Sequence, residues 1–565
     1  MFKKYMKKAI ALVLATSMLA VCGCGQQAEK PSEKESTPVT SESKSEEKTS
    51  ESKASEAVEE ERVTLTVFAT ERYVEDYETN YYTKMLEEKA NVDLEFITVP
   101  RDDFPQKLSL MINGGEELPD VIAHYGVNKV EYEYGSAGFF LPLNEYFEDP
   151  EATPNFHKFV TAKDQEYMLK FVKTADGNIY AAPSYRPSVM TNFYNNRAWI
   201  NVEWLEAIGK EMPTTTEDFY EVLKAFKEMD PNGNGKADEI PAVSATQGRF
   251  GFYYLLSPFG YVSNAGQNYM NVDADGKVYP AFTTEEWKEG LTYINKLVSE
   301  DLYTPLSFTQ DNNAFRAMVR DADVQKVGVY FSGSYDSLEG AGMNSFEPLP
   351  PLTGPNGDCF VNFGDVAADG RFVITKDCDN IEAAVRLMDA LYDSEITAIS
   401  RLGEPEVDWT TNVPDGYVRM DGKEEKPGYI LINNIWGTVN NKHWTCYTVT
   451  YENQDDPLCA DGLGISADDP TSLRSLQEAK AMSLLKEKGT WQENRIVKLL
   501  HDPADITEFT DLQTAIKTYV DESMTRFSTG DLPLSQWDEY IKTLEGMGLD
   551  RFVELTQKGY ENFNK

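Results

Sequence analysis

The chain has 565 residues and carries 94 Asp and Glu side chains against 53 Lys and Arg, which gives a formal net charge of −41. Phosphate backbones and anionic lipid headgroups repel a polyanion of this size, so the charge excludes nucleic-acid binding. The length exceeds what one hydrophobic core usually fills, and it predicts at least two lobes.

The N-terminus has the pattern of an export signal. Four lysines precede an apolar run from Ala9 to Ala20, which is too short to cross a bilayer as a mature helix. The run ends in Val21-Cys22-Gly23-Cys24-Gly25, which resembles a bacterial lipobox, and Cys24 fits the lipidated position better than Cys22 because a small residue precedes it. We expect residues 1–23 to be a lipoprotein signal peptide. An ordinary cleaved signal is the alternative, and the cysteine at the cleavage point disfavours it.

A charged, polar stretch follows the signal. Between Gln26 and Glu60 the chain holds eleven Ser and Thr, ten Glu, five Lys and no aromatic residue. Such a composition buries too little apolar surface to offset the entropy of ordering the chain. We expect residues 24–61, with lipidated Cys24 at their start, to be a disordered tether that holds the body off the membrane near a partner embedded there. A charged run without any partner is the alternative.

The body opens with an α/β pattern. The stretch 63–68 alternates as a strand, 81–90 has the apolar spacing of a helix, and 92–97 alternates again, which predicts a βαβ unit. A second helix-like stretch at 103–113 leads to a short apolar strand at 118–123. Loops at the strand ends of such a sheet face a ligand crevice, so we expect an α/β lobe here.

The rest of the body alternates extended and helical patterns before becoming helix-rich. A strand at 372–375 followed by a helix at 380–393 indicates a return to the first lobe. We expect an N-terminal lobe of residues 62–185 and 368–408, and a C-terminal lobe of residues 186–367 and 409–565. The other extended segments that we predict are 179–183 and 193–195, with a strand at 324–331. Helices are predicted at 199–208, 469–488, 511–526, 534–546 and 549–563, and a further helix is predicted to begin at a Thr cap near 215.

Several short motifs follow one another along the body. They are Gly114-Gly115 before Leu118-Pro119-Asp120, Asp176-Gly-Asn-Ile-Tyr180, Trp204-Leu205 before Pro213-Thr-Thr215, Gly403-Glu404-Pro-Glu-Val-Asp-Trp409, Phe527-Ser-Thr-Gly530 and Trp537-Asp-Glu-Tyr540. With the lipobox and the opening βαβ unit, their order and spacing cover most of the body. In this order the chain resembles bacterial ABC-importer extracellular solute-binding lipoproteins of the carbohydrate-binding group, family 1.

The resemblance implies an α/β, two-lobed periplasmic-binding-protein-like fold of the class II type, with a hinge of two or three crossing segments and a helix-rich C-terminal region. It implies a monomeric receptor that closes on an oligosaccharide in the cleft between the lobes and delivers it to the permease subunits of an ABC importer. The receptor would lie on the extracellular face of the cell membrane, in contact with lipid only through its anchor. An exported, tethered, acidic and aromatic-rich chain without a catalytic array fits a binding protein better than an enzyme.

One loop has the spacing of a calcium site. Asp230, Asn232, Asn234 and Asp238 occupy positions 1, 3, 5 and 9, Gly235 allows the sharp turn at 6, and Lys236 offers its backbone carbonyl at 7. The EF-hand places a bidentate Glu at position 12, where this chain has Pro241, and the acid is Glu239 at position 10 instead. The resemblance implies that such a variant loop holds Ca²⁺ as a structural ion. An Asn/Gly turn without metal is the alternative.

Sugars bind to flat aromatic faces and to fixed hydrogen-bonding groups, and the chain is 12% aromatic. For any single ring, core packing is as good an explanation as ligand contact. The negative field favours neutral oligosaccharides over polyuronates unless Arg186 reverses it locally. The candidate ligand contacts are Tyr125, Tyr185, Arg186, Asn192, Tyr335, Asn362, Asp365, Glu404, Trp409, Trp436 and Trp444.

Two alternatives to the sugar receptor stay open. An extracellular carbohydrate-active enzyme would need two carboxylates about 5 to 9.5 Å apart across a glycosidic bond, and 94 acids always offer some pair. A receptor of the same fold for peptides is the other alternative. The six cysteines form no zinc-binding spacing, and whether Cys446 and Cys459 form a disulfide is left open by the sequence.

Overall fold

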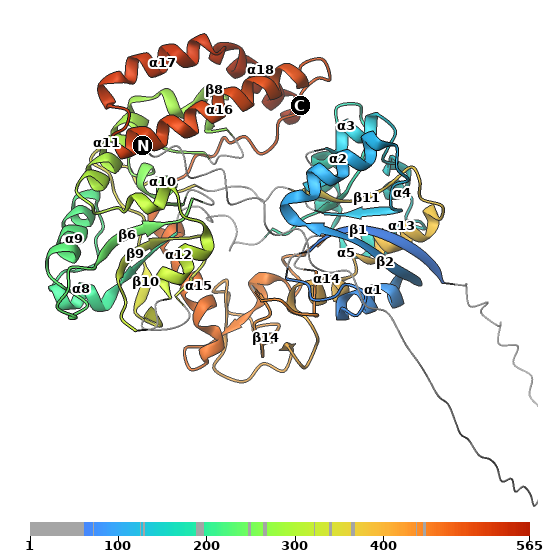
Figure 1. Ribbon diagram of the computed structural model, residues 1–565. Helices are drawn as coiled ribbons and strands as arrows, with labels where there is room; N and C mark the ends of the chain where they lie inside the picture. The colour runs from blue at the N-terminus through green and yellow to red at the C-terminus, as the bar shows by residue number, and fades with distance from the viewer. Residues whose placement is uncertain are drawn as a thin grey trace, which may run out of the picture. The chain divides into compact units, whose positions relative to one another are not determined.

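The computed structural model describes residues 62–565 except 72, 125, 128–129, 188–196, 247–249, 264–267, 321–322, 338–341, 363–367, 437 and 445–447 (Figure 1). The predicted signal peptide, Cys24 and the tether lie outside the described residues. The chain from Glu60 to Lys565 forms one compact unit. Among the described helices, none has both the length and the apolar character that a membrane span needs.

The first of two main sheets has five strands in the order β2-β1-β3-β11-β4. The parallel pair β1 and β2 runs in register from Val63 opposite Val92 to Glu71 opposite Pro100, and β11 pairs antiparallel with both β3 and β4. Alternating side chains of β1 serve two cores, because Leu65 and Val67 pack on the side of α1 and α13 whereas Phe68 packs on the side of α2. The strands are β1 (Val63–Glu71), β2 (Val92–Pro100), β3 (Val121–Ala123), β4 (Ala182–Ser184) and β11 (Asp369–Ile374).

Helices cover both faces of this sheet. Helix α1 begins after Asn80, whose side chain accepts a hydrogen bond from the Tyr82 N–H, and it ends at Asn91 in the left-handed conformation. The helices of this half are α1 (Tyr81–Ala90), α2 (Phe104–Gly114), α3 (Glu131–Ser136), α4 (Asn144–Glu148), α5 (Pro154–Phe159), α6 (Ala162–Val172), α13 (Ile381–Ala390) and α14 (Ser394–Leu402).

The second main sheet has four strands in the order β10-β5-β9-β6. Its large core contains residues of the helices α8 to α11 and of the C-terminal helices α16 to α18. Figure 1 shows α16 next to α11, with α17 above α16. The strands are β5 (Ala198–Asn201), β6 (Ile240–Ser244), β9 (Val327–Phe331) and β10 (Phe346–Pro348), with a separate hairpin of β7 (Met270–Val272) and β8 (Val278–Pro280). The helices are α8 (Val202–Ile208), α9 (Thr216–Glu228), α10 (Phe250–Leu256), α11 (Glu285–Ser299), α12 (Asn312–Val319), α15 (Leu473–Lys488), α16 (Ile506–Thr529), α17 (Trp537–Gly546) and α18 (Leu549–Asn564).

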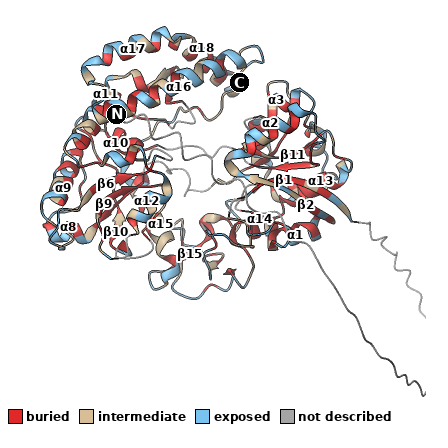
Figure 2. Cartoon of the chain, viewed as in Figure 1, coloured by how far each residue is buried: buried red, intermediate tan, exposed pale blue. Residues whose placement is uncertain are grey.

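A smaller region with its own core lies between α14 and α15. It contains two two-stranded sheets, and its centre is Trp409 packed edge-on against Tyr429 at 6.2 Å. The strands are β12 (Trp409–Thr410) with β14 (Ile430–Leu431), and β13 (Val418–Arg419) with β15 (Gly464–Ile465). Figure 2 shows the strands of both main sheets as buried, with the exposed residues on the outer faces of the helices.

Most predicted elements are confirmed, and one is half wrong. The predicted helix at 199–208 is strand β5 up to Asn201, after which α8 begins, because Trp199 and Ile200 pair with both β9 and β10. The predicted division into lobes also differs from the packing. Trp444 and Tyr451, which we assigned to the C-terminal lobe, pack into the core of the first sheet. The predicted extended segment at 193–195 lies outside the described residues.

Candidate functional site

A hollow of about 380 Å³ opens where β1 and β2 end. The carboxyl ends of parallel strands are where α/β sheets bind their ligands. Four of its eight lining residues are acidic. The lining residues are Glu71, Val74, Glu75, Asp76, Tyr77, Glu78, Phe96 and Thr98.

Hydrogen bonds hold two carboxylates of the hollow in place. Asp76 accepts hydrogen bonds from the Thr79 hydroxyl at 2.8 Å and from the Glu78 N–H at 3.0 Å, and these bonds lower the pKa of its carboxyl. Glu71 accepts one from the Thr98 hydroxyl at 2.9 Å across the strand pair. Ionised carboxylates only accept hydrogen bonds, so the hollow is built for a ligand that donates them.

An exposed tryptophan lies on a loop that is hydrogen-bonded to this hollow. The loop that carries Trp436 is joined to the hollow through Asn440, whose N–H donates to the Tyr73 carbonyl and whose carbonyl accepts from the Glu75 N–H, both at 3.0 Å. The Asn440 side chain also donates to the Ile435 carbonyl at 2.9 Å, which holds the loop closed. Trp436 is 37% exposed, more than any other tryptophan among the described residues.

The ring of Trp436 packs against a side chain that is neutral at pH 7. It meets the edge of His443 at 4.9 Å, and burial lowers the pKa of that histidine to about 4. Glu404, another predicted contact, is tied to the same loop, because its carboxylate pairs with the Lys442 ammonium at 2.5 Å. The structure thus brings Trp436 and Glu404 together in one region.

Three predicted aromatic contacts are core residues, which corrects the prediction that they line a ligand site. Tyr335 is fully buried, with its ring edge-on against Trp199 at 5.1 Å. Trp409 donates its indole N–H to the Gly403 carbonyl at 3.0 Å inside the core of the small region. Trp444 is enclosed by three rings and donates to the Thr83 hydroxyl at 2.8 Å. Large aromatic side chains stabilise a protein most when they are buried, and these three follow that rule.

The predicted polar contacts Arg186 and Asn362 make bonds within the protein. Arg186 Nε pairs with the Glu452 carboxylate at 2.5 Å, so the arginine does not reverse the negative field as the sequence allowed. Asn362 is buried and donates to the Val262 carbonyl at 3.0 Å. Tyr185 is half-buried and packs against Tyr167 with ring centroids 5.0 Å apart. Tyr125, Asn192 and Asp365 lie outside the described residues.

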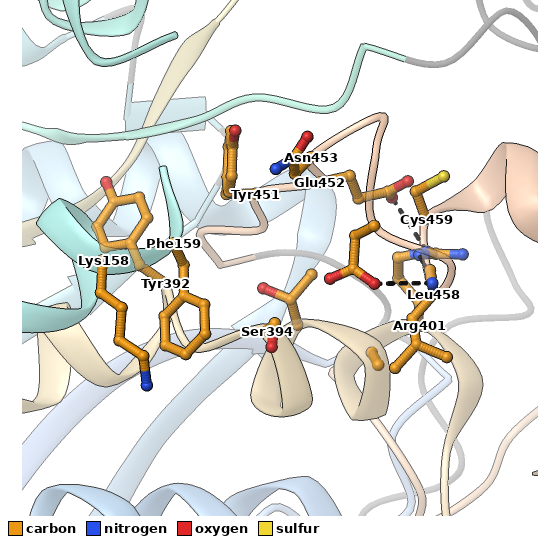
Figure 3. Close-up of a pocket in the computed structure, with 13 residues that line it drawn as sticks. Lys158, Phe159, Tyr392, Ser394, Arg401, Tyr451, Glu452, Asn453, Leu458 and Cys459 are labelled. Carbon is orange, nitrogen blue, oxygen red and sulfur yellow. Dashed lines mark hydrogen bonds and ion pairs between the residues drawn. The ribbon is translucent and has the colours of Figure 1, made fainter. Parts of the chain in front are cut away.

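A small cavity of about 160 Å³ lies beside the partner of Arg186 (Figure 3). Figure 3 shows Glu452 and Arg401 on one side of it and Lys158, Phe159 and Tyr392 on the other. Glu452 pairs with Arg401 at 3.0 Å as well as with Arg186, and it accepts the Ala460 N–H at 2.8 Å. Burial raises the pKa of Glu452, but the two arginines outweigh burial and hold the pKa below its usual value. Because it is buried and paired with two arginines, Glu452 braces the structure and offers little to a ligand.

The thiol of Cys459 also borders this cavity. It is buried and free, and it donates to the Gln454 carbonyl at 3.6 Å. Cys446, the other cysteine of the pair that the sequence left open, lies outside the described residues.

The predicted calcium loop follows α9 and folds around its own oxygens. Asp230 accepts hydrogen bonds from the N–H groups of Asn234 at 3.2 Å and Gly235 at 3.0 Å, and Asp238 accepts one from the Asn234 amide at 2.9 Å. The Asn232 and Asn234 side-chain oxygens accept from the N–H groups of Asn234 at 3.0 Å and Lys236 at 2.7 Å. The loop therefore gathers the predicted oxygen side chains on one short stretch of chain.

One atom of this loop lacks a partner. The Oε1 atom of Glu239 is buried and accepts no hydrogen bond, and burial raises the pKa of its carboxyl, with Asp230 and Asp238 adding to the rise. A hard cation would satisfy this oxygen and relieve the repulsion among the three acids. No three His, Cys, Asp or Glu side chains in the described part of the chain are grouped tightly enough to hold a metal on their own, so the asparagine oxygens would have to contribute.

The acids of the hollow were missed in the sequence. Glu71 to Glu78 contain four acids directly after a strand, and that position was the available signal. Of the loops near the strand ends of this sheet, the predicted ligand contacts include Tyr125 after β3 but no residue of the longer loop after β1.

Comparisons with known proteins place the chain among bacterial transport proteins. The model of a family described as bacterial extracellular solute-binding protein matches residues 69–398. The fructooligosaccharide ABC transporter substrate-binding protein FusA of Streptococcus pneumoniae serotype 4 (strain ATCC BAA-334 / TIGR4) is 27% identical over 578 residues, covering 100% of this chain and 99% of FusA. Lipoprotein LipO of Bacillus subtilis (strain 168) is 29% identical over 223 residues, covering 39% of this chain and 40% of LipO.

Two solved structures have the same fold. FusA of S. pneumoniae in complex with kestose has a TM-score of 0.73 and 24% identity, covering 89% of this chain and 99% of that one. A FusA EF-hand mutant in complex with fructo-nystose has a TM-score of 0.72 at 24% identity and the same coverage. These likenesses confirm the expected two-lobed fold.

Proposed function

The chain belongs to the bacterial extracellular solute-binding protein family, and we propose that it is a receptor that binds a neutral oligosaccharide and delivers it to an ABC importer. The observation that carries the sugar assignment is the acidic hollow at the ends of β1 and β2, together with the exposed Trp436 on a loop that is hydrogen-bonded to the hollow at Glu75. Carboxylates accept hydrogen bonds from sugar hydroxyls, and an indole face covers the C–H patch of a sugar ring. The similarity to FusA, which is named for fructooligosaccharide, supports the same class of ligand.

The charge of the hollow selects against acidic sugars. Glu71, Glu75, Asp76 and Glu78 surround one opening, so a uronate would meet like charges at short range. A neutral sugar avoids this repulsion and still offers hydroxyl protons to each carboxylate. A peptide with basic groups would satisfy the charge, but it would make less use of an exposed indole face.

The anchor and the cation belong to the same proposal. Lipidated Cys24 and the tether of residues 24–61 would hold the receptor on the extracellular face of the membrane, and the similarity to a lipoprotein supports this location. The oxygens of Asp230, Asn232, Asn234, Asp238 and Glu239 and the carbonyl of Lys236 would hold Ca²⁺. The existence of an EF-hand mutant of FusA supports this assignment.

The test is calorimetry of the purified protein with a panel of neutral oligosaccharides, polyuronate fragments and peptides. We expect a neutral oligosaccharide to bind, and Asp76→Asn to weaken it at least tenfold, because an amide accepts fewer hydrogen bonds than a carboxylate. Asp538→Asn, on the exposed start of α17, is the matched control and should leave the affinity unchanged.

Two results would contradict the sugar receptor. Binding of peptides but not of sugars would establish the peptide alternative. Chromatography that finds shortened sugars after incubation with the protein would establish an enzyme, because a receptor returns its ligand intact.

A further inference from the structure

A second hollow, of about 430 Å³, lies entirely in the half of the molecule built on the second main sheet. It is bounded by the end of α10, the start of α11, the β7–β8 hairpin, residues 358–360 and Gln492. Its volume falls in the range of about 300 to 1,000 Å³ that is typical of small-molecule pockets. None of its lining residues belongs to the acidic hollow at the ends of β1 and β2.

Aromatic side chains form its walls. The rings of Tyr279 and Phe360 are half-buried, so each keeps part of its surface toward solvent. Tyr261 supports Phe360 edge-on at 6.3 Å, and the buried Trp287 also lines the hollow. Rings held in this way present fixed apolar surface without losing much conformational freedom when a ligand binds.

The polar groups of the hollow include a directed donor. The Tyr279 oxygen accepts a hydrogen bond from the Asn271 amide at 3.3 Å and from the Gln492 amide at 3.2 Å. Asn271 is itself fixed, because it donates to the Tyr261 carbonyl at 2.8 Å and accepts from the Ser263 N–H at 3.2 Å. With its oxygen occupied as an acceptor twice, the tyrosine has its own proton left to donate.

Acceptors lie on the rim of the same hollow. The carboxylates of Glu286 and Asp358 both line it, and neither forms an ion pair with a described residue. A ligand of this hollow would cover the faces of the aromatic rings, accept a hydrogen bond from the Tyr279 hydroxyl and donate hydrogen bonds to the two carboxylates. Such a ligand needs C–H patches and hydroxyl groups on one ring. These features describe a neutral sugar, and the two carboxylates disfavour a uronate.

We propose that this hollow is a second sugar-ring site. The proposal rests on the proposed function, because the two hollows share one ligand chemistry, yet it is carried by different residues. Asp358 and Phe360 belong to the chain that leads from β10 into β11, so the site is partly built from a connection between the two main sheets. A bound sugar ring therefore contacts a connecting segment as well as the second core.

The experiment is calorimetry of the full chain with the panel of neutral oligosaccharides, on the wild type and on variants of each hollow. We expect Tyr279→Phe and Asp358→Asn each to weaken the best-bound oligosaccharide about tenfold at unchanged melting temperature. Tyr519→Phe, on α16 and away from the lining, is the matched control and should bind as the wild type does. Phe360→Ala should weaken binding further. Because the Phe360 ring is half-buried, that variant can lose both stability and a ligand contact, so the two polar variants decide the test.

Hydrogen exchange gives a local readout. With sugar bound, amides at 278–287 and 358–360 should be protected, and Tyr279→Phe should remove that protection while amides at 73–80 stay protected. Wild-type binding that neither polar variant weakens would overturn the second site and leave the receptor standing. A wild type that binds no sugar of the panel would overturn both.

Discussion

The difference between Trp436 and the other predicted tryptophans lies in what covers each ring. Trp444 is surrounded by Tyr77, Tyr82 and Phe96, and Trp409 packs against Tyr429, so neither ring has a face for a ligand. Among the described rings, Trp436 contacts His443 edge-on, and it remains more than a third exposed. Burial therefore separates the stabilising rings from the ring that we propose for sugar binding.

This contrast predicts opposite effects of the same substitution. Trp436→Ala should lower the free energy of oligosaccharide binding by about 2 kcal/mol and leave the melting temperature nearly unchanged. Trp436→Phe should recover most of the affinity because it restores an aromatic face. Trp409→Ala should instead lower the free energy of unfolding by about 3 to 5 kcal/mol, as measured by denaturant unfolding. If Trp436→Ala binds sugar as the wild type does, the ring does not contact the ligand.

Two buried histidines make stability depend on pH. Burial lowers the pKa of both His443 and His501 to about 4, below the unfolded value of about 6.5. Between these values the unfolded chain binds more protons than the folded one, so stability is complete above about pH 6.5 and is lost as the pH falls toward 4. Each histidine should account for about 2 kcal/mol of the loss at pH 5.

The measurement is urea unfolding at pH 7 and pH 5. His501→Gln should reduce the difference between the two pH values by about 2 kcal/mol, whatever it does to stability at pH 7. An unaltered difference in both His501→Gln and His443→Gln would show that other groups cause the acid sensitivity.

At the scale of single elements, the periodicity of apolar residues predicted those helices and strands whose formation depends on their local sequence. The helix at 81–90 is α1 to the residue, and the helix predicted from a Thr cap is α9, where Thr215 and Asp218 form a reciprocal capping box. Residues 199–201 were predicted as helix but belong to β5, whose residues are all buried and show no alternation. Only its pairing with β9 and β10, distant in sequence, reveals the strand.

The brace at Glu452 joins three elements that the sequence did not connect. Its carboxylate is almost fully buried between Arg186 and Arg401, 266 and 51 residues away along the chain. Glu452→Gln would leave two arginines facing a neutral group, and we expect the free energy of unfolding to fall by about 3 to 5 kcal/mol. Glu539→Gln removes an exposed pair with Lys542 at 3.8 Å and should change stability by less than about 1 kcal/mol. Similar effects of the two substitutions in urea unfolding would contradict the bracing role.

The loop after α9 should make stability depend on calcium. A cation that binds only the folded state stabilises it by about 2.7 kcal/mol at 100 times its dissociation constant. Calcium should therefore raise the melting temperature of metal-stripped protein, and Asp230→Asn together with Asp238→Asn should abolish the rise. The pair Asp273→Asn and Asp275→Asn, in the β7–β8 turn, should retain it. Equal melting with calcium and with chelator in the wild type would reject the site.

At the scale of the whole molecule, the sequence predicted the fold better than the site. The fold follows from many local patterns in order, whereas the site depends on which distant segments meet. The acidic loop after β1 contacts the Trp436 loop through Asn440, although the two loops are more than 350 residues apart in the chain. Neither segment alone predicts this contact. The sugar was implied by the family resemblance, whereas composition predicted only that acids and aromatic rings are plentiful, and both hollows contain them.

The half built on the first main sheet and the half built on the second are also joined by side-chain contacts, in addition to the segments of chain that connect them. The ammonium of Lys498 donates to the carbonyls of Phe171 and, at 3.5 Å, Lys173, and the ring of Phe563 meets Phe171 at 5.6 Å. Val497 and Phe563 thus pack on the core of the first sheet although their neighbours in the chain belong to the second. Contacts of this kind, between side chains and carbonyls, break and re-form more easily than a paired strand does.

A receptor of this fold is expected to become more compact when it binds its sugar, because two binding surfaces gain affinity when they enclose one ligand. Solution scattering of the purified protein should show a smaller radius of gyration with a saturating oligosaccharide than without it. At a sugar concentration that saturates only the wild type, Trp436→Ala should keep the larger radius of gyration. The dissolved sugar alone does not close the protein, because closure requires bound sugar. An enzyme with a preformed groove need not change its dimensions. Equal radii for the free and the saturated wild type would remove hinge closure and leave a rigid binding protein.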